Sequence, residues 1–263
     1  MTSHGYRSSI DDIGYRAAFD FRPSPRHHIR FGQDYTYHRF QPQTYNRFDN
    51  YQTNSEAKAD TIETHSYNKN VAHQLTFYAE DEMTLNEKWS LNGGVNADVF
   101  HISGKTFATL SPRLSMKFQP TERLSLKARY TLMSQFVHKI ANSFHDLPTD
   151  YWVPTTARLH PMRSWQVAAG AYMKPNKHWL LSLEAYYKRS SHILQYSSWA
   201  GLEPPAANWD YMVMEGDSRS YGVELDADYN ISNLTLHGSY TLSWTEKKFD
   251  CLLYTSPSPR DRG

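Results

Sequence analysis

The chain has 263 residues, a formal net charge of +1 and a mean hydropathy of −0.71. A charge so close to zero gives no sign of a nucleic-acid-binding surface, and no apolar run is long enough for a membrane-spanning helix. Hydropathy does not exclude a membrane β-barrel, because only every second residue of a barrel strand faces lipid. Aromatic residues make up 14% of the chain, which suits the aromatic girdles of a barrel and also a soluble carbohydrate-binding β fold.

The first residues after Met1 show no charged region followed by an apolar one, so they do not read as a signal peptide. Either the protein is cytoplasmic or Met1 is not its native start. We favour the second, because the residues that follow have the character of a domain interior.

Alternation of apolar and polar residues, which places them on opposite faces of a strand, predicts a series of hairpins. The first pairs residues 13–21 with 29–37 around a proline-rich turn, since proline cannot donate to a sheet ladder. Residues 41–72 are polar and show no sustained period, which predicts a long irregular loop. Such a loop is uncommon in a compact soluble domain and expected on the outer side of a large barrel.

The second hairpin pairs residues 75–85 with 89–99. Asp81 falls on its apolar face, where a charge near mid-bilayer costs up to roughly 2–4 kcal/mol, less for Asp and less near the interfaces. We therefore expect one of three things: a bulge at Asp81, a position of Asp81 near the membrane interface, or a strand whose apolar and polar faces are the reverse of those assigned here. The third hairpin pairs residues 114–118 with 124–132, and its polar face is basic.

The second half of the chain repeats this arrangement. Irregular segments are predicted at residues 134–163 and 190–219, and hairpins at residues 165–187 and 220–244. The whole chain then has about ten strands, with short turns inside hairpins and mostly long loops between them. Outer-membrane barrels sort loop lengths by end in this way, and strands of about ten residues can cross a bilayer when tilted. A soluble antiparallel sheet with one packed face is the alternative.

Three segments, residues 75–100, 160–189 and 218–244, resemble the barrel of TonB-dependent outer-membrane receptors. The motifs that carry the likeness are an aromatic residue followed by an acidic pair at one strand end, a Gly-Val-Glu-Leu strand start, and an aromatic residue at the bilayer edge. The resemblance covers most of residues 10–250. It implies an all-β fold class, an antiparallel transmembrane β-barrel, of which residues 1–250 supply about ten of about 22 strands.

The resemblance also implies a function. The complete receptor binds a scarce ligand (a siderophore, cobalamin or an oligosaccharide) in its outer loops and passes it inward when the energised TonB complex remodels an N-terminal plug. The sequence shows no plug, no TonB-contacting segment and no final aromatic-ended strand, so we expect a fragment. The expected partners are outer-membrane lipid, the TonB complex through the missing plug, the ligand and a lipoprotein, and the expected location is the bacterial cell outer membrane.

Two alternatives stay open. One is a passive porin-like or peptidoglycan-anchored barrel, and the other is a soluble or secreted carbohydrate-binding β protein. No P-loop, paired CxxC, HExxH or GxSxG motif occurs, so neither enzyme activity nor a cofactor is predicted.

Histidine is frequent but does not fall in a metal-binding pattern. His27 and His28 adjoin a turn, while His138, His145 and His160 lie in or beside one irregular segment. No spacing fixes these residues on a rigid element together with a carboxylate, and metal sites need several ligands in a defined geometry. We therefore expect solvated loop histidines rather than a metal site.

Two groups of candidate binding residues remain. Exposed loop aromatics on a rigid scaffold often carry recognition, although they can equally pack the loops or form an interfacial girdle; they are Tyr151, Trp152, Trp199, Trp209 and Tyr211. Charged residues on the polar strand faces form either a ligand path or, as we favour, a polar lumen satisfied by water and neighbours. They are Glu184, Glu224, Asp226, Asp228, Arg113, Lys117, Lys127 and Arg129.

Residues 251–263 differ in character from the rest. Their first part, CLLYTSPSPRD, resembles the translation of a transposon-end sequencing adapter, and an ordinary Ser/Pro-rich loop is the alternative. The sequence therefore predicts a non-native tail. Cys251, the single cysteine, then carries no information about the redox compartment.

Overall fold

The computed structural model describes residues 2–53, 56–66, 70–140, 151–196 and 209–249. Within these ranges the chain is almost entirely β-structure, and the one helical element is a short 3-10 turn, η1 (Trp209–Met212). No helix in the described part of the chain has the length and apolarity that a membrane crossing needs. The predicted non-native tail, residues 251–263, lies outside the described ranges.

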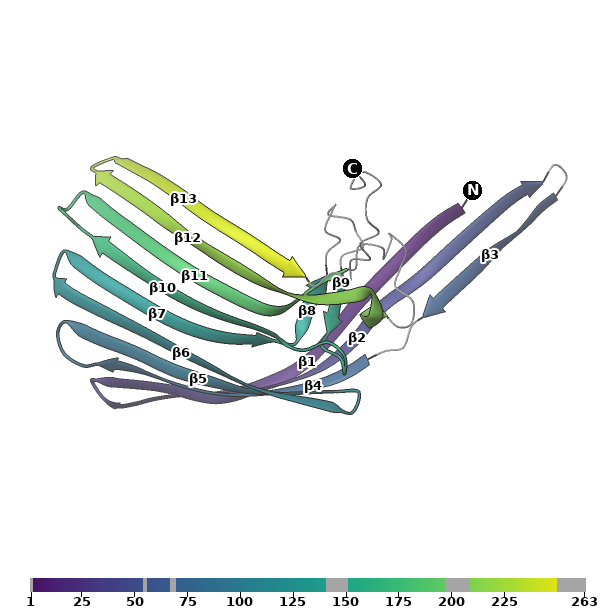
Figure 1. Ribbon diagram of the computed structural model, residues 1–263, viewed down its shortest axis with the longest axis horizontal. Coiled ribbons are helices and arrows are strands. Elements are labelled where there is room, and N and C mark those ends of the chain that lie inside the picture. Colours follow the sequence, from purple (N-terminus) through teal and green to yellow (C-terminus); the bar gives the residue numbers. More distant parts are fainter. Residues whose placement is uncertain (1, 54–55, 67–69, 141–150, 197–208, 250–263) are drawn as a thin grey trace, which may run out of the picture.

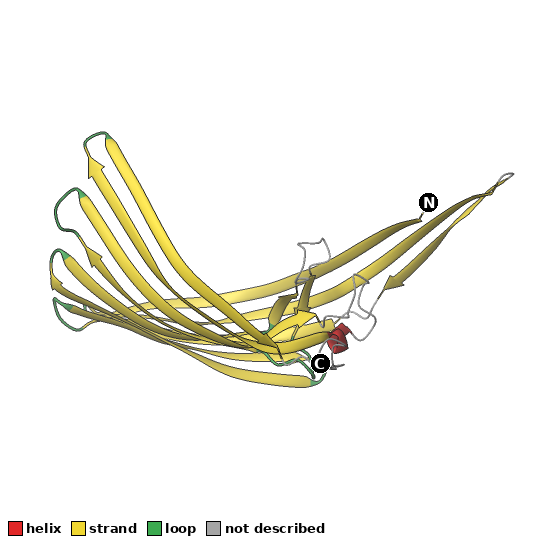
Figure 2. Cartoon of the chain, turned by 45° about the horizontal axis from the view of Figure 1, so that its top comes forward, coloured by secondary structure: helices red, strands yellow, loops and turns green. Residues whose placement is uncertain are grey.

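Ten strands in the described residues form a continuous, curved antiparallel sheet that follows chain order (Figures 1 and 2). They are β1 (Thr2–Ser24), β2 (His27–Thr53), β4 (Asn70–Thr84), β5 (Trp89–Ile102), β6 (Lys105–Thr121), β7 (Leu124–Gln135), β10 (Met162–Met173), β11 (Trp179–Tyr196), β12 (Val213–Ile231) and β13 (Leu234–Phe249). An eleventh strand, β3 (Glu56–Ser66), pairs with β2 beside this path. The prediction of about ten antiparallel strands is confirmed.

All the predicted hairpins are present, and their short turns gather at one end of the sheet, at the left of Figure 1. Asparagine side chains close two of these turns. Asn86 Oδ1 accepts hydrogen bonds from the backbone N–H groups of Lys88 and Trp89, at 2.9 and 3.0 Å. Asn176 does the same for His178 and for Trp179, the first residue of β11. An asparagine that bonds to the backbone two residues on stabilises a tight turn, so these turns are encoded locally.

The strand register places the predicted apolar residues on the convex face of the sheet. Leu225 of β12 pairs with Leu183 of β11 on one side and Tyr240 of β13 on the other. All three are exposed to the surroundings, Leu225 at 47%. A continuous exposed apolar face of this kind is typical of a surface that faces lipid rather than water.

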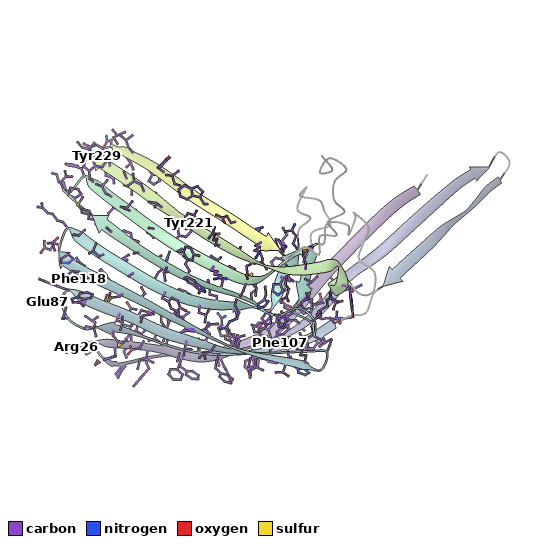
Figure 3. All side chains as sticks on the ribbon, in the orientation of Figure 1. Arg26, Glu87, Phe107, Phe118, Tyr221 and Tyr229 are labelled. Carbon is purple, nitrogen blue, oxygen red and sulfur yellow. The ribbon has the colours of Figure 1, made fainter. Side chains whose placement is uncertain are left out.

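Aromatic rings gather near both edges of this apolar face. Trp179 and Tyr229 lie beside the short turns, with ring centroids 4.8 Å apart. Tyr221 stacks on Trp244 further along the strands, at 5.4 Å. Figure 3 labels Tyr229 at the turn end of β12 and Tyr221 eight residues before it in the chain. This spacing matches the two aromatic girdles of a membrane barrel.

Asp81 remains in register, so of the three alternatives the structure shows no bulge at this position. It pairs with Ile29 and Gly93 without a register shift, on the apolar face. The residue lies near the end of β4, close to the short turns, and its Oδ2 is 2.7 Å from His27 Nδ1. The carboxylate is therefore placed near the edge of the apolar face and paired, which avoids the cost of a charge at its centre.

The segments at the other end of the sheet are more ordered than the sequence predicts. β2 and β3 form a long hairpin inside residues 41–72, and β8 (Val137–Ile140) pairs with β9 (Tyr151–Pro154) inside residues 134–163. β11 and β12 likewise extend into residues 190–219. The prediction of irregular loops was wrong for these parts. Strands beyond an apolar band do not have one face toward lipid and the other toward a polar interior, so their sequences need not alternate.

Apolar side chains are buried at this long-loop end, on the concave side of the sheet. The ring of Phe136, which precedes β8, stacks on Phe100 of β5, with centroids 4.8 Å apart. Two clusters form in this region: Phe40, Ala72, Phe100, Ile102 and Phe136 in one, and Ile140, Val153, Leu159 and Val213 in the other. The segment of β8 and β9 therefore folds inward and packs against the sheet, as Figure 2 shows.

Candidate functional site

The concave face carries the charged residues that the sequence assigns to a lumen. The register puts them on the face opposite the apolar residues: Glu184, Glu224, Asp226, Asp228, Arg113, Lys117, Lys127 and Arg129. Several have short polar contacts, such as Ser182 Oγ to Asp226 Oδ2 at 3.2 Å and His237 Nδ1 to Asp228 Oδ1 at 2.7 Å. Their assignment to a lumen and their role as a ligand path both stay predictions.

Glu80 of β4 is held between two arginines on this face. Its carboxylate lies 2.6 Å from Arg30 of β2 and 2.5 Å from Arg113 of β6, and its side chain is 13% exposed. Arg113 reaches Glu80 across β5, where the residue in register with both is Gly94. A Cβ at Gly94 would lie 2.9 Å from Arg113 Nε and 2.9 Å from Glu80 Cβ. The missing side chain at position 94 is therefore what lets this pair form.

A second polar cluster lies nearer the short turns. The Tyr172 hydroxyl donates to Glu184 at 2.5 Å, and Lys127 Nζ lies 4.2 Å from the centre of the Tyr172 ring. Together with Arg129 they line a hollow on the concave face. The cluster combines a carboxylate, two cations and an aromatic ring, so it can bind polar groups of either sign.

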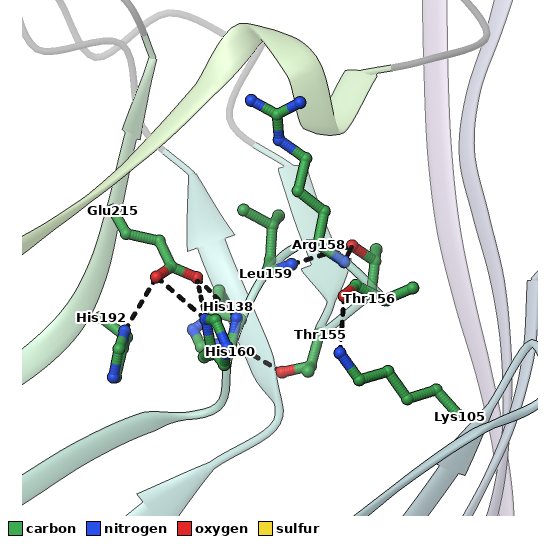
Figure 4. A network of polar contacts seen from close by, with 10 residues as sticks. Lys105, His138, Thr155, Thr156, Arg158, Leu159, His160, His192 and Glu215 are labelled. Atoms are coloured by element: carbon green, nitrogen blue, oxygen red, sulfur yellow. Dashed lines mark hydrogen bonds and ion pairs between the residues drawn. The ribbon is translucent and has the colours of Figure 1, made fainter.

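At the long-loop end, two histidines converge on one carboxylate (Figure 4). Glu215 Oε2 lies 2.8 Å from His192 Nδ1 and 3.2 Å from His160 Nδ1. The backbone N–H of His160 also donates to Glu215 Oε1 at 2.6 Å. The two imidazole centroids are 5.0 Å apart. These side chains come from the segment before β10, from β11 and from β12.

A tight turn before His160 and a β-bulge at His192 set the directions of these two side chains. Thr156 Oγ1 accepts hydrogen bonds from the N–H groups of Arg158 and Leu159, both at 3.2 Å, which forms a tight turn just before His160. His192 is the extra residue of a β-bulge between β11 and β12 and has a φ of 58°. A bulge re-aims a side chain, and a residue other than glycine with positive φ is uncommon and is held only by its surroundings.

Hydrogen bonding and burial shift two pKa values here. Burial raises the pKa of Glu215, but hydrogen bonds from the His160 backbone and from the His192 and His160 rings outweigh it, so the pKa lies below its usual value. Neighbouring His138 is buried, and this lowers its pKa to about 4 despite the attraction of Glu215. Glu215 is thus an anion at neutral pH, and His138 is neutral.

The predicted loop aromatics are only partly within the described residues. Trp152 of β9 and Tyr211 of η1 are exposed, and the Arg158 guanidinium lies 4.2 Å from the centre of the Tyr211 ring. Trp199, and the side chains of Tyr151 and Trp209, lie outside what the structure describes. Their proposed role in recognition stays a prediction.

The histidines expected to be solvated differ from that expectation in several places. His138 is buried and lies 3.2 Å from Thr155 Oγ1, and His160 contacts Glu215. His27 and His28 each lie beside an aspartate, and His145 is outside the described residues. Sequence reasoning missed His192 and Glu215, which are separated by 23 residues. Only the pairing of β11 with β12 brings these two together, so no local motif could show them.

The comparisons with known proteins agree with this architecture. The family model "TonB dependent receptor-like, beta-barrel" matches residues 2–262. No curated protein sequence matches the chain.

Among solved structures, the FrpB iron transporter from Neisseria meningitidis (F3-3 variant) is similar at a TM-score of 0.59 and 15% identity, over 91% of this chain and 36% of that one. The copper transporter OprC gives a TM-score of 0.63 at 14% identity, over 92% of this chain and 38% of that one. The ferric yersiniabactin uptake receptor FyuA from Yersinia pestis gives a TM-score of 0.58 at 14% identity, over 94% of this chain and 37% of that one.

These identities are low, so the likeness to solved structures shows the fold alone. The chain spans less than two fifths of the length of these three structures. The family match, in contrast, covers nearly all of the chain and agrees with its hairpins, its curved sheet and its apolar convex face. The chain therefore belongs to the TonB-dependent receptor-like β-barrel family.

Proposed function

We propose that this chain forms part of the barrel of an outer-membrane receptor that imports a scarce ligand with energy supplied through TonB. The family match over residues 2–262 carries this proposal. The exposed apolar face between two aromatic girdles supports a position in lipid, because a soluble protein rarely leaves so large an apolar patch uncovered.

The edges of the sheet support a larger barrel around this chain. Among the described strands, β1 and β13 each have a neighbour on one side only. An unpaired backbone N–H or C=O in lipid costs several kcal/mol, so spanning sheets close into barrels. Further strands therefore have to pair with both edges. The matched structures are also about two and a half times as long as this chain.

For the ligand, a ferric siderophore is our first candidate, ahead of cobalamin or an oligosaccharide. Three similar structures are named as an iron transporter, a copper transporter and a ferric yersiniabactin receptor. In this chain, Trp152, Tyr211 and the polar concave face offer aromatic and charged contacts for such a ligand. A plug that contacts TonB, and a lipoprotein partner, belong to the same proposal.

An uptake assay in cells grown under iron limitation tests the proposal. The native gene is deleted, and uptake of a radiolabelled ferric siderophore is measured in the deletion strain, the complemented strain and a strain without TonB. We expect uptake to need both the gene and TonB. Uptake that needs the gene but not TonB would identify a passive pore. Unchanged uptake for ferric siderophores, cobalamin and oligosaccharides alike would reject a receptor function.

The same locus tests the predicted tail. We propose that residues 251–263 are not native, although the family match extends to residue 262. Sequencing the locus across both ends is expected to replace the tail with further alternating strands and to reveal a signal peptide and plug upstream. An open reading frame that begins at Met1 and continues through Cys251 would contradict both expectations.

A further inference from the structure

The cluster of His160, His192 and Glu215 has the composition of a transition-metal site. Two imidazoles and one carboxylate are the ligands that zinc and ferrous iron take in many proteins, with the remaining coordination positions left to water or substrate. Within the described ranges, this is the one group of three or more His, Cys, Asp or Glu residues whose ligand atoms all lie within 4.8 Å of one another.

The distances from the carboxylate to the two imidazoles are close to those that a bound ion requires. At metal–ligand distances of about 2.0–2.2 Å, two ligands of a tetrahedral ion are about 3.3–3.6 Å apart. Glu215 Oε2 is 3.2 Å from His160 Nδ1 and 2.8 Å from His192 Nδ1. A bound ion therefore needs these atoms to separate by roughly half an ångström, with each imidazole proton moved to Nε2.

The scaffold beneath the cluster is rigid enough to hold such geometry. His192 and Glu215 sit on the paired strands β11 and β12, and His160 follows directly on Leu159. Leu159 is buried with Ile140, Val153 and Val213 in the apolar cluster where the inward-folded segment meets β12. The hydrogen bond from the His160 backbone N–H to Glu215 Oε1 holds His160, the third ligand, against β12.

The cluster is also open to solvent at the long-loop end. The side chains of His160, His192 and Glu215 are 56%, 38% and 24% exposed. The positive φ of His192 is an independent feature, because a bulge with strained backbone often re-aims a side chain at a functional site. We propose that His160, His192 and Glu215 bind one divalent transition-metal ion, which reaches them from the long-loop side.

The experiment is a zinc titration of the full-length protein from its native locus, purified in detergent and stripped with a chelator. Isothermal titration calorimetry gives the affinity and stoichiometry, and the visible absorption of Co²⁺ added in place of Zn²⁺ reports nitrogen and oxygen coordination. The variants are His192→Ala and Glu215→Gln. We expect one ion per chain, with affinity reduced by more than about 100-fold in each variant, since loss of an outer hydrogen-bonding partner alone costs up to that much.

His237→Ala is the matched control. His237 Nδ1 lies 2.7 Å from Asp228 Oδ1, a similar histidine–carboxylate pair that is not part of a three-residue group in the described chain. Its loss is expected to leave zinc affinity unchanged. Equal affinity in the unsubstituted protein, His192→Ala and Glu215→Gln would overturn the proposal, as would the absence of binding. The titration measures no transport, so its failure would leave the receptor function untouched.

Discussion

Replacing Leu225 with arginine tests whether the convex face lies in lipid. Leu225 is midway between Tyr221 and Tyr229, the two aromatic residues of β12 at the edges of the apolar face. Four residues on either side, at about 3.3 Å each, place it roughly 13 Å along the strand from both. With a strand tilt of about 40°, the girdles are then about 20 Å apart across the membrane, comparable to the apolar band of known barrels. Leu225 thus lies near the midplane.

An arginine on the lipid face at the midplane costs about 2–4 kcal/mol. Glu224→Arg places the same side chain one residue away, on the concave face beside Glu184. At this position the arginine replaces the Glu224 carboxylate, so that two adjacent negative charges become a pair of opposite charges with Glu184. We expect Glu224→Arg to change the free energy of unfolding by no more than about 0.5 kcal/mol.

Both variants are made in the full-length protein, folded into lipid vesicles and unfolded reversibly with guanidinium chloride, with tryptophan fluorescence as the signal. The measured quantity is the difference in unfolding free energy between each variant and the unsubstituted protein. A cost for Leu225→Arg no larger than that for Glu224→Arg would refute the assignment of the two faces. A protein that stays folded and soluble without detergent would refute the membrane position altogether.

Two further predictions concern the concave face and the inward-folded segment. Gly94→Val pushes Arg113 away from Glu80 and should cost about 1–3 kcal/mol by overpacking, whereas Gly93→Val, whose nearest neighbour is 3.8 Å away on the open apolar face, should be tolerated in the same unfolding assay. Because the pKa of His138 is lowered to about 4, its neutral form stabilises β8 and β9 fully above about pH 6.5, and this contribution is lost as pH falls toward 4. By pH 5 the loss reaches roughly 2 kcal/mol, seen as faster amide hydrogen exchange in β8 and β9; a pH dependence that persists in His138→Gln would contradict this cause.

The sequence predicts the strands within the apolar band well, because one face of each strand meets a different environment from the other. Tyr221, Leu225 and Tyr229 alternate with acidic residues for that reason, and the register agrees with them. In β8, by contrast, the polar His138 is buried together with Ile140, so the apolar period disappears and the strand was missed. Local signals such as Asn86 still locate the turns.

The candidate sites were harder to predict because their contacts join distant strands. Glu80 and Arg113 are separated by 33 residues and meet only because β5 carries a glycine between them. His160 and Glu215 are 55 residues apart. Charge and residue type indicate that such groups lie on a polar face. Which of them contact each other across strands depends on the register and on whether the intervening strand has a glycine at that position.

The agreement between sheet order and chain order has a consequence for how the protein folds. Along the main path, each described strand pairs with its predecessor in the chain, apart from the steps over β3 and over β8 with β9. The sheet can therefore grow by adding one strand at a time to a single edge, with a short turn to close inside each hairpin and a longer connection to close between most hairpins. Loop-closure entropy rises with the logarithm of loop length, so the step from β7 to β10, which also has to fold β8 and β9 inward, is expected to be the slowest addition. Shortening that connection is expected to change the folding rate while leaving the register of the other strands as it is.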